Sequence, residues 1–325
     1  MVKFGVVLLI EEYNLVELKN TWLEIAQMGF DSAWFGDHFI PYLIQEEGHD
    51  YSDKHLEPYT ILPTLVNDTP ELRCGLMVTC NSYRNPAILT KISSSIDRIS
   101  GGRFQLGIGA GWYKEEYNSY GIPFPELQIR LEQFEEAVNL IHRIWTQDKV
   151  TFRGKYYNVT NLVMTPKPIQ KPHPPIWIGG KSRESIQVAA KYGDYVNFAN
   201  TTPEEYKLKL DILEKYCREI GRNFSELGKS WHGDMIIVDR EEDKKIEVLK
   251  YKEKCSESRD NMEKLMEMEI EDITKGMIVG TAEQCVEKIQ EFLDVGVDHI
   301  IPYFPNNKEG RALQTFTEKI VPNFK

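Results

Sequence analysis

Cysteine is scarce and unpatterned in this chain of 325 residues. The five cysteines are odd in number, are scattered and form no CxxC pair: Cys74, Cys80, Cys217, Cys255 and Cys285. Such usage argues against a disulfide framework or a zinc cluster and favours a reducing cytoplasm. The motifs HxH, HExxH and GxSxG are also absent, which argues against the common zinc and serine hydrolases. We therefore predict a cytoplasmic protein without a bound metal.

The chain also lacks a long apolar run and an excess of basic residues. Its longest apolar run, Phe4–Ile10, is too short to span a bilayer, and the N-terminus shows no signal-peptide pattern. The net charge is −11, which argues against nucleic acid as the main partner because phosphate backbones need a basic face. A small anionic cofactor remains compatible, since backbone N–H groups hold a phosphate locally.

What the chain does contain is a regular alternation of strand-like and helix-like segments. Eight apolar segments predict strands: Phe4–Ile10, Asp31–Phe35, Arg73–Thr79, Phe104–Ile108, Ile176–Ile178, Tyr195–Phe198, Met235–Val238 and His299–Tyr303. Segments with helical spacing follow them, the clearest being Ala87–Ile99 and Ile129–Trp145. Continuous apolar strands are typical of a parallel sheet buried on both faces. Eight such units at this length predict a TIM (β/α)8 barrel, with residues 1–325 as a single domain.

Three segments are longer than a simple βα unit requires. Pro41–Glu57 is polar and mixed, Gln147–Pro175 combines strand-like residues with a proline-rich run, and Asp239–Lys275 is highly charged. TIM-barrel sites lie at the C-terminal ends of the strands. We therefore expect insertions at that face, with the first two covering the site.

Alternate glycines end the fourth predicted strand. Gly107, Gly109 and Gly111 are followed directly by Trp112 and Tyr113. A dinucleotide fingerprint would read G-x-G-x-x-G, open a helix and lie in the first βαβ unit, and this segment does none of these. Two interpretations remain: the glycines give room to a flat cofactor, or they serve a tight turn that needs positive φ.

A second glycine pair ends the fifth predicted strand. Gly179 and Gly180 are followed by Lys181 and Ser182, and a helix begins there. Free N–H groups at a helix N-terminus suit a phosphate, Ser182 can cap the helix, and Lys181 adds positive charge. The alternative is an ordinary strand-to-helix turn with a serine cap.

Asp37 and His38 end the second predicted strand. Histidine is the side chain best suited to proton transfer near neutral pH, and an adjacent aspartate can orient it or bind a cofactor edge. The rim of a barrel favours this interpretation over a purely structural histidine. Asn85, by contrast, is best explained as a helix cap before Pro86.

Four segments together resemble the bacterial luciferase-like monooxygenase superfamily, and more narrowly its coenzyme F420-dependent oxidoreductases. These segments are Gly29–Phe39, Thr79–Pro125, Pro166–Gly180 and Gly280–Pro305, so the resemblance runs through nearly the whole chain. It implies a TIM barrel whose cofactor lies across the C-terminal ends of the strands, with an insertion that shapes the pocket.

The resemblance also implies roles for individual residues. The implied cofactor-binding residues are Asp37, Leu76, Met77, Thr79, Gly109, Gly111, Gly179, Gly180, Lys181 and Ser182. Asp37 and His38 would lie beside the deazaflavin ring, and we expect His38 to be the proton donor or base. The bulge at Leu76 and Met77 would carry a non-proline cis peptide bond.

Two positions depart from the sugar-phosphate dehydrogenases of this branch. Trp112 stands where those proteins carry a glutamate that acts as an acid, which argues against that proton route and against a sugar-phosphate substrate. Tyr42 stands where a tryptophan often closes their pocket. We expect Tyr42 and Trp112 to be walls of the substrate pocket.

The residues and the resemblance together predict an oxidoreductase that transfers a hydride between coenzyme F420 and a small organic substrate. One alternative is an FMN-dependent monooxygenase that uses O2, and another is a barrel that binds a cofactor without catalysis. The Asp37–His38 pair favours F420, because such a pair is typical of the F420-dependent relatives. We expect a small-molecule substrate, no nucleic-acid or membrane partner, and a homodimer as in many relatives.

Overall fold

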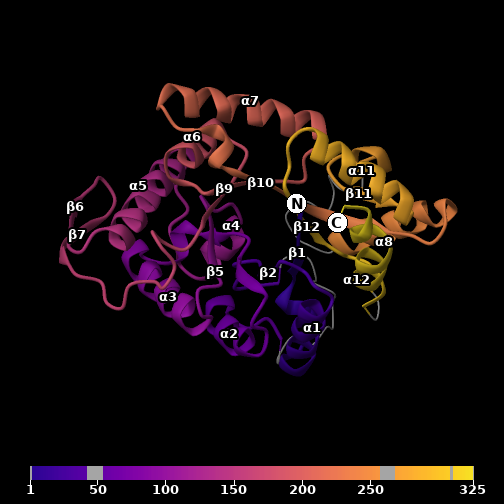
Figure 1. Cartoon of the computed structure of the whole chain (residues 1–325), viewed down its shortest axis with the longest axis horizontal. Coiled ribbons are helices and arrows are strands. Elements are labelled where there is room, and N and C mark those ends of the chain that lie inside the picture. Colours follow the sequence, from indigo (N-terminus) through magenta and orange to yellow (C-terminus); the bar gives the residue numbers. More distant parts are fainter. Residues whose placement is uncertain (1, 42–53, 257–267, 308–309, 325) are drawn as a thin grey trace.

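Eight parallel strands close into a barrel in the part of the chain that the structure describes (Figure 1). The computed structural model describes residues 2–41, 54–256, 268–307 and 310–324. The barrel strands are β1 Lys3–Leu8, β2 Ser32–Phe35, β3 Arg73–Leu76, β5 Phe104–Gly109, β8 Ile176–Gly179, β9 Tyr195–Ala199, β10 Gly228–Ile237 and β12 His299–Tyr303. Each pairs in parallel with the next, and β12 pairs with β1 to close the ring. The predicted TIM barrel is confirmed.

Helices surround the barrel and connect its strands. They include α1 Leu15–Gln27, α2 Pro58–Leu65, α3 Pro86–Ile99, α5 Leu127–Thr146, α6 Arg183–Tyr192, α7 Pro203–Glu219, α11 Ala282–Asp294 and α12 Arg311–Thr315. Capping boxes begin α1, α7 and α11, in which a side chain at the first residue and one three residues later satisfy each other's backbone N–H groups. Helices α3 and α5 lie within two residues of the predicted segments Ala87–Ile99 and Ile129–Trp145. A π-helical turn over Phe316–Ile320 follows α12.

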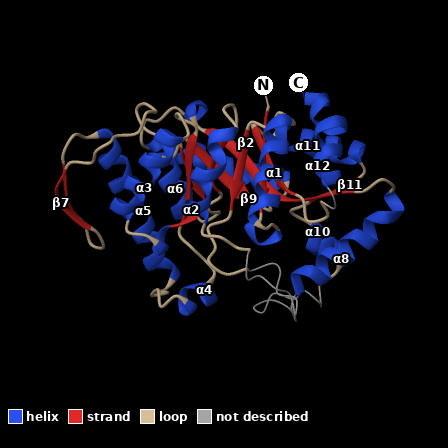
Figure 2. Ribbon diagram, turned by 90° about the horizontal axis from the view of Figure 1, so that it is seen from below, coloured by secondary structure: helices blue, strands red, loops and turns tan. Residues whose placement is uncertain are grey.

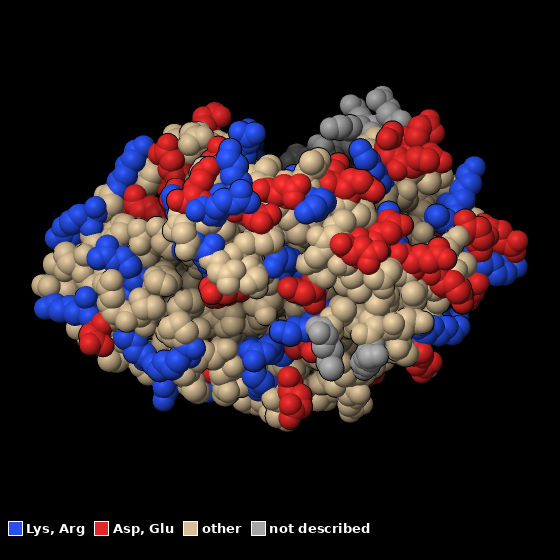
Figure 3. All heavy atoms as spheres, turned by 45° about the horizontal axis from the view of Figure 1, so that its top comes forward, with Lys and Arg blue, Asp and Glu red and all other residues tan. Residues whose placement is uncertain are grey.

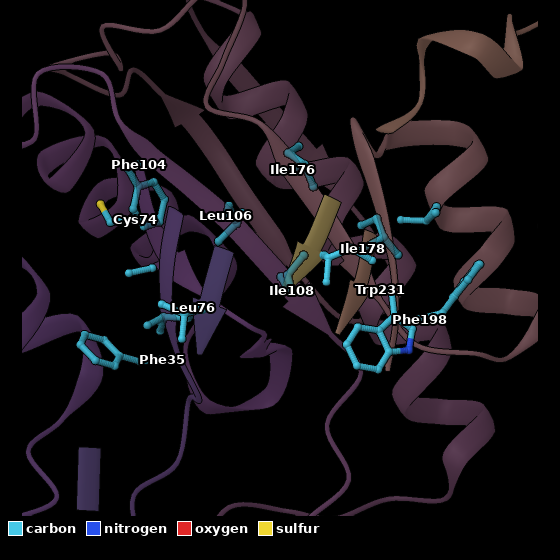
Figure 4. Packing of buried hydrophobic residues seen from close by; sticks show 14 of the residues in the cluster. Phe35, Cys74, Leu76, Phe104, Leu106, Ile108, Ile176, Ile178, Phe198 and Trp231 are labelled. Atoms are coloured by element: carbon cyan, nitrogen blue, oxygen red, sulfur yellow. The ribbon is translucent and has the colours of Figure 1, made fainter. Parts of the chain in front are cut away.

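The barrel strands build two separate cores, because successive side chains point to opposite faces of a strand. One set points outward to the helices; it includes Leu76, Leu106, Ile108, Ile176 and Ile178 (Figure 4). The other set fills the barrel interior and consists of Val7, Leu9, Trp34, Met77, Trp177, Ile301 and Tyr303. In the interior, the rings of Trp34 and Trp177 meet edge to face at 4.8 Å. The interior is therefore packed, and cavities open toward its two mouths.

The seventh barrel strand lies earlier in the chain than the sequence predicted. The apolar run Met235–Val238 was expected to form it, but residues 228–232 of β10 pair with β9 and residues 230–234 pair with β12. Met235–Ile237 instead pair with a further strand, β11 Ile278–Gly280, which the apolar pattern did not predict. The reason is polarity: the inward positions Ser230, His232 and Asp234 interrupt the apolar run by which a barrel strand is recognised.

The insertion Gln147–Pro175 forms an antiparallel hairpin, β6 Val150–Arg153 and β7 Asn158–Leu162. Figure 2 places β7 at one end of the molecule, beyond α3 and α5. The carboxylate of Glu136 on α5 accepts backbone N–H bonds from Lys155, Tyr156 and Tyr157 at 2.6–2.9 Å, which fixes the hairpin to that helix. The charged insertion Asp239–Lys275 contains α8 Lys244–Ser256 and α10 Ile270–Thr274.

The surface agrees with the composition of the chain. On the face that Figure 3 shows, acidic and basic side chains are interspersed without a continuous basic area. Among the described residues, the helices are all too short or too polar to cross a bilayer. Figure 2 shows both termini on the side of the barrel opposite to α4 Lys114–Ser119.

We predict that Trp34→Ala destabilises the protein by about 3–5 kcal/mol, because it empties the barrel interior of a large ring. Trp34 is fully buried, and its Nε1 donates to Ser32 Oγ at 2.8 Å. Leu208→Ala is the matched control: Leu208 is 64% exposed, so its loss should change stability by about 0.5 kcal/mol or less. Urea denaturation measures both, and equal losses would contradict the packed interior.

Candidate active site

A cavity of about 410 Å³ opens at the C-terminal ends of the barrel strands. Its lining comes from the ends of β2, β5, β8, β9 and β10 and from β4 Thr79–Cys80 with the bulge before it. The described lining contains no residue of Gln147–Pro175, so the expectation that this insertion covers the site is wrong. Most of Pro41–Glu57, including Tyr42, lies outside the described residues.

The glycines of β5 and β8 make room for a bulge of the neighbouring strand. The peptide bond Met77–Val78 is cis, at the expected bulge, which here separates β3 from β4. A Cβ on Gly109 would lie 2.9 Å from Val78 Cγ2, and a Cβ on Gly179 would lie 2.9 Å from both Val78 methyl carbons. A Cβ on Gly107 would overlap the Leu76 carbonyl oxygen. These glycines therefore let Val78 reach the floor of the cavity.

Gly111 has a different and more local reason to be glycine. Its φ is +82°, and a Cβ there would overlap Tyr117 Oη and lie 2.7 Å from Cys80 Sγ. The turn after β5 and the packing of Tyr117 thus require a glycine, which matches the structural alternative for this position. Burial raises the pKa of Cys80 to about 12, so its thiol stays protonated near neutral pH and is a poor nucleophile.

His38 is held by a carboxylate that the sequence did not single out. His38 Nδ1 lies 3.1 Å from Glu116 Oε2, and the Glu116 side chain is fully buried on α4. Glu116 also accepts from Tyr83 Oη and from the backbone N–H groups of Phe39 and Ile40. Burial opposes its ionisation, but the hydrogen bonds that it accepts and its electrostatic interaction with the His38 ring outweigh burial and lower the pKa of Glu116. The result is an oriented imidazole in the cavity lining.

Asp37 forms a buried ion pair. Arg84 Nη1 donates to Asp37 Oδ2 at 2.7 Å, Arg84 Nη2 donates to Oδ1 at 2.9 Å, and the Cys80 N–H donates to Oδ2 at 2.9 Å. Arg84 also donates to Glu57, which caps α2. Bidentate pairs of this kind fix geometry as well as charge. Asp37 therefore joins β2 to the turn after β4 and lies in the wall of the cavity.

The second glycine pair lies in the turn between a strand and a helix N-terminus, as predicted. Gly179 ends β8, Gly180 follows with a φ of +125°, and α6 begins at Arg183. Ser182 Oγ accepts from the Ser185 N–H at 3.1 Å, so the predicted cap is present. Burial and the nearby Lys209 lower the pKa of Lys181, which lines the cavity beside the glycines.

The far wall of the cavity was not predicted. It is lined by residues of β9, of β10 and of the bend directly after β9: Asn197, Ala199, Asn200 and His232. His232 was missed because β10 was placed too late in the chain. The asparagines lack a recognisable motif, although their positions at the end of a barrel strand were a usable signal.

The remaining predicted residues fall into three groups. Met77, Thr79 and Trp112 line the cavity; Thr79 Oγ1 lies 2.6 Å from Tyr59 Oη, and Trp112 stacks on Tyr113 at its rim. Leu76, Gly109 and Ser182 lie outside the lining: Leu76 packs among the outward side chains, Gly109 lies behind Val78, and Ser182 caps α6. Tyr42 lies outside the described residues.

Fold and site together define a TIM-barrel protein with its ligand cavity where enzymes of this fold keep their active sites. The comparison with protein families makes the assignment specific. The chain belongs to the luciferase-like monooxygenase family, whose model matches residues 2–299.

Curated relatives and solved structures extend this comparison. The chain is 26% identical to an F420-dependent glucose-6-phosphate dehydrogenase of Amycolatopsis mediterranei (strain U-32), with 100% of this chain and 99% of that protein covered. It is 28% identical to an FMNH2-dependent dimethylsulfone monooxygenase of Pseudomonas putida over 61% of this chain and 55% of that protein. An F420-dependent secondary alcohol dehydrogenase, solved with an F420–acetone adduct, has the same fold, with a TM-score of 0.86, 22% identity and coverage of 100% of this chain and 99% of that chain.

We predict that Glu116→Gln weakens the dependence of stability on acid pH. Because the folded pKa of Glu116 lies below its ordinary value, the ionised carboxylate stabilises the wild type above pH ~4.3, and this contribution is lost as the pH falls through the lowered pKa. The variant lacks this titration. Urea denaturation between pH 7 and pH 3 should show a smaller fall in unfolding free energy for the variant, and parallel curves would contradict the assignment.

Proposed function

We propose that this protein is an oxidoreductase that transfers a hydride between coenzyme F420 and a small alcohol or carbonyl substrate. The observation that carries the proposal is His38, held by the buried Glu116 in a cavity whose lining also contains Gly179, Gly180 and Lys181 before a helix N-terminus. Curated relatives support it, because two that match 99–100% of this chain are named as F420-dependent glucose-6-phosphate dehydrogenases.

The described residues fit a flat cofactor with a phosphate. The glycines at 109 and 179 bring Val78 to the floor of the cavity as an apolar surface, and Met77 adjoins it. Gly179, Gly180 and Lys181 would hold the phosphate through backbone N–H groups and one ammonium group at the start of α6. The side chains of Asp37, Thr79 and Trp112 would surround the cofactor ring. Coenzyme F420, when bound, would supply the hydride acceptor or donor.

The chain's own part in the reaction is proton transfer and positioning. When the alcohol loses its hydride, its hydroxyl proton must leave as well, and His38 would accept it while a carbonyl product forms. The Glu116 carboxylate holds the His38 imidazole in place through Nδ1, and it would stabilise the imidazolium that forms when His38 accepts the proton. In the reverse direction His38 would return the proton to the carbonyl oxygen as the hydride arrives at carbon. No glutamate follows the glycine loop directly, since Trp112 occupies that position.

A second candidate is an FMN-dependent monooxygenase that uses O2. The relative from Pseudomonas putida favours it, but that relative matches 61% of this chain, whereas the F420-dependent relatives match nearly all of it. A homodimer and a cytoplasmic location stay predictions.

Fluorescence titration of the purified protein with F420 and with FMN tests the choice of cofactor. We expect saturable binding of F420 with a Kd at least ~10-fold lower than that of FMN. This ratio corresponds to a difference of about 1.4 kcal/mol in binding free energy. Anaerobic hydride transfer to F420 from a panel of small alcohols should follow. Binding of FMN alone, with O2 consumption, would establish the monooxygenase instead.

Lys181→Ala tests the phosphate loop. Loss of a charged hydrogen-bond partner should raise the Kd of F420 by roughly 10-fold or more, corresponding to about 1.5–3 kcal/mol. Lys207→Ala is the matched control, because Lys207 is an exposed lysine on α7 that pairs with Asp211 away from the cavity. Equal affinities of the two variants would place the phosphate elsewhere.

His38→Asn tests the proton-transfer role. We expect kcat to fall by about 10²–10⁴-fold, the usual contribution of a general acid or base, while the Kd of F420 changes little. A variant with wild-type kcat would remove His38 from the mechanism.

A further inference from the structure

We propose that His232 contacts the bound ligands directly, with its Nε2 accepting a hydrogen bond from an N–H or O–H group. The donor is either an imide N–H of the cofactor ring or a hydroxyl of the substrate. This inference rests on the proposed function and adds a specificity-determining residue to the wall opposite the His38 side. His232 lies on β10, three strands around the barrel from β2, which carries His38 at its end.

The tautomer of His232 is fixed by the neighbouring strand. Its Nδ1 lies 2.9 Å from the Ile301 carbonyl oxygen, its register partner on β12. A carbonyl oxygen only accepts hydrogen bonds, so Nδ1 carries the hydrogen. Burial lowers the pKa of His232, which keeps the ring neutral. A neutral imidazole protonated on Nδ1 has a lone pair on Nε2, and this atom is an acceptor.

Asp234, the nearest carboxylate on the same strand, is engaged elsewhere. It lies two residues further on the same face of β10, and its Oδ2 accepts from Tyr251 Oη at 3.0 Å and from Asn200 Nδ2 at 3.3 Å. Among the described residues, no hydrogen bond reaches His232 Nε2. The acceptor therefore serves whatever occupies the cavity that His232 lines.

The side-chain amide of Asn197, on the neighbouring strand β9, adds a second hydrogen-bond acceptor to this wall. Ser230 Oγ donates to the Val196 carbonyl at 2.9 Å, so it receives the hydrogen bond from Asn197 Nδ2, also at 2.9 Å. The donor end of Asn197 is thereby turned to the barrel wall, and its oxygen is the end left for a ligand. Asn200 differs, because both ends of its amide are engaged by Asp234: Nδ2 donates to Asp234 Oδ2 at 3.3 Å, and Oδ1 accepts from the Asp234 N–H at 3.2 Å.

Donors and acceptors consequently lie side by side along this part of the lining. The turn after β8 offers donors, namely the N–H groups of Gly180 and Lys181 and the Lys181 ammonium group. The adjacent strands β9 and β10 offer acceptors, the Oδ1 of Asn197 and the Nε2 of His232. Ligands that turn both an anionic group and an N–H or O–H group to these three strands match this arrangement.

His232→Phe and His232→Gln test the proposal in the whole protein. Phenylalanine keeps a flat ring but has no acceptor, whereas glutamine keeps an acceptor oxygen. We expect His232→Phe to raise one binding constant by about 3–10-fold, the effect of one neutral hydrogen bond, and His232→Gln to recover part of the loss. A raised Kd for F420 identifies the cofactor imide as the donor, and a raised KM with unchanged Kd identifies the substrate hydroxyl.

His299→Phe is the matched control. His299 is a buried barrel histidine on β12 whose Nε2 lies 3.1 Å from Ser32 Oγ, and it lines a cavity at the opposite mouth of the barrel. It should leave both constants unchanged. An upfield shift of the ¹⁵N resonance of His232 Nε2 on ligand binding would support the contact independently of activity.

Two results would overturn the inference. One is a His232→Phe variant with wild-type Kd and KM, in which case hydride transfer by the wild type shows that the proposed function still stands. The other is an equal loss in the phenylalanine and glutamine variants that follows a fall in Tm, which would make His232 structural. Failure of the wild type to bind either F420 or FMN would instead overturn the proposed function, and this inference with it.

Discussion

The cavity depends on the empty space beside three glycines. Gly107, Gly109 and Gly179 lie on two neighbouring strands, and the volume that their side chains would fill is taken by the bulge before β4, with Val78 at its tip. Any larger residue there would push Val78 into the ligand space or force β4 from β5. The floor of the site is thus set by steric complementarity between strands, a constraint that interiors as dense as those of proteins enforce strongly.

Beside that floor, one buried carboxylate organises the wall of the cavity that contains His38. Glu116 receives hydrogen bonds from His38, from Tyr83 and from two backbone N–H groups that follow β2, and it thereby joins three segments distant in sequence. A buried carboxylate is costly unless such donors surround it. The buried Glu116 carboxylate therefore needs its four hydrogen-bond donors, and all of these hydrogen bonds together determine the orientation of the His38 imidazole.

The sequence predicted features that depend on neighbouring residues within one strand. It did not predict features that depend on contacts between residues distant in the chain. Apolar runs located seven of the barrel strands, and strand ends located Asp37, His38 and both glycine loops. Glu116 was missed because a glutamate at the start of a short helix looks solvated until the fold brings β2 against it. The seventh strand was misplaced because its polar inward residues, His232 among them, serve the cavity and break the apolar pattern. The functional face of a barrel is where composition rules are least informative.

The networks around Asp37 and Glu116 also hold the chain at the end of β2 and at the start of α2. The chain leaves β2 through Ile40, whose N–H is held by Glu116, and it enters α2 at Glu57, which is held by the same Arg84 that grips Asp37. Both flanks of residues 42–53 are therefore anchored to the barrel by hydrogen bonds of described residues. Glu116 couples the orientation of His38 to the point where the chain leaves β2, and Arg84 couples Asp37 to the point where it enters α2. A change at either of these two buried charges would therefore disturb one wall of the cavity and the adjoining chain together.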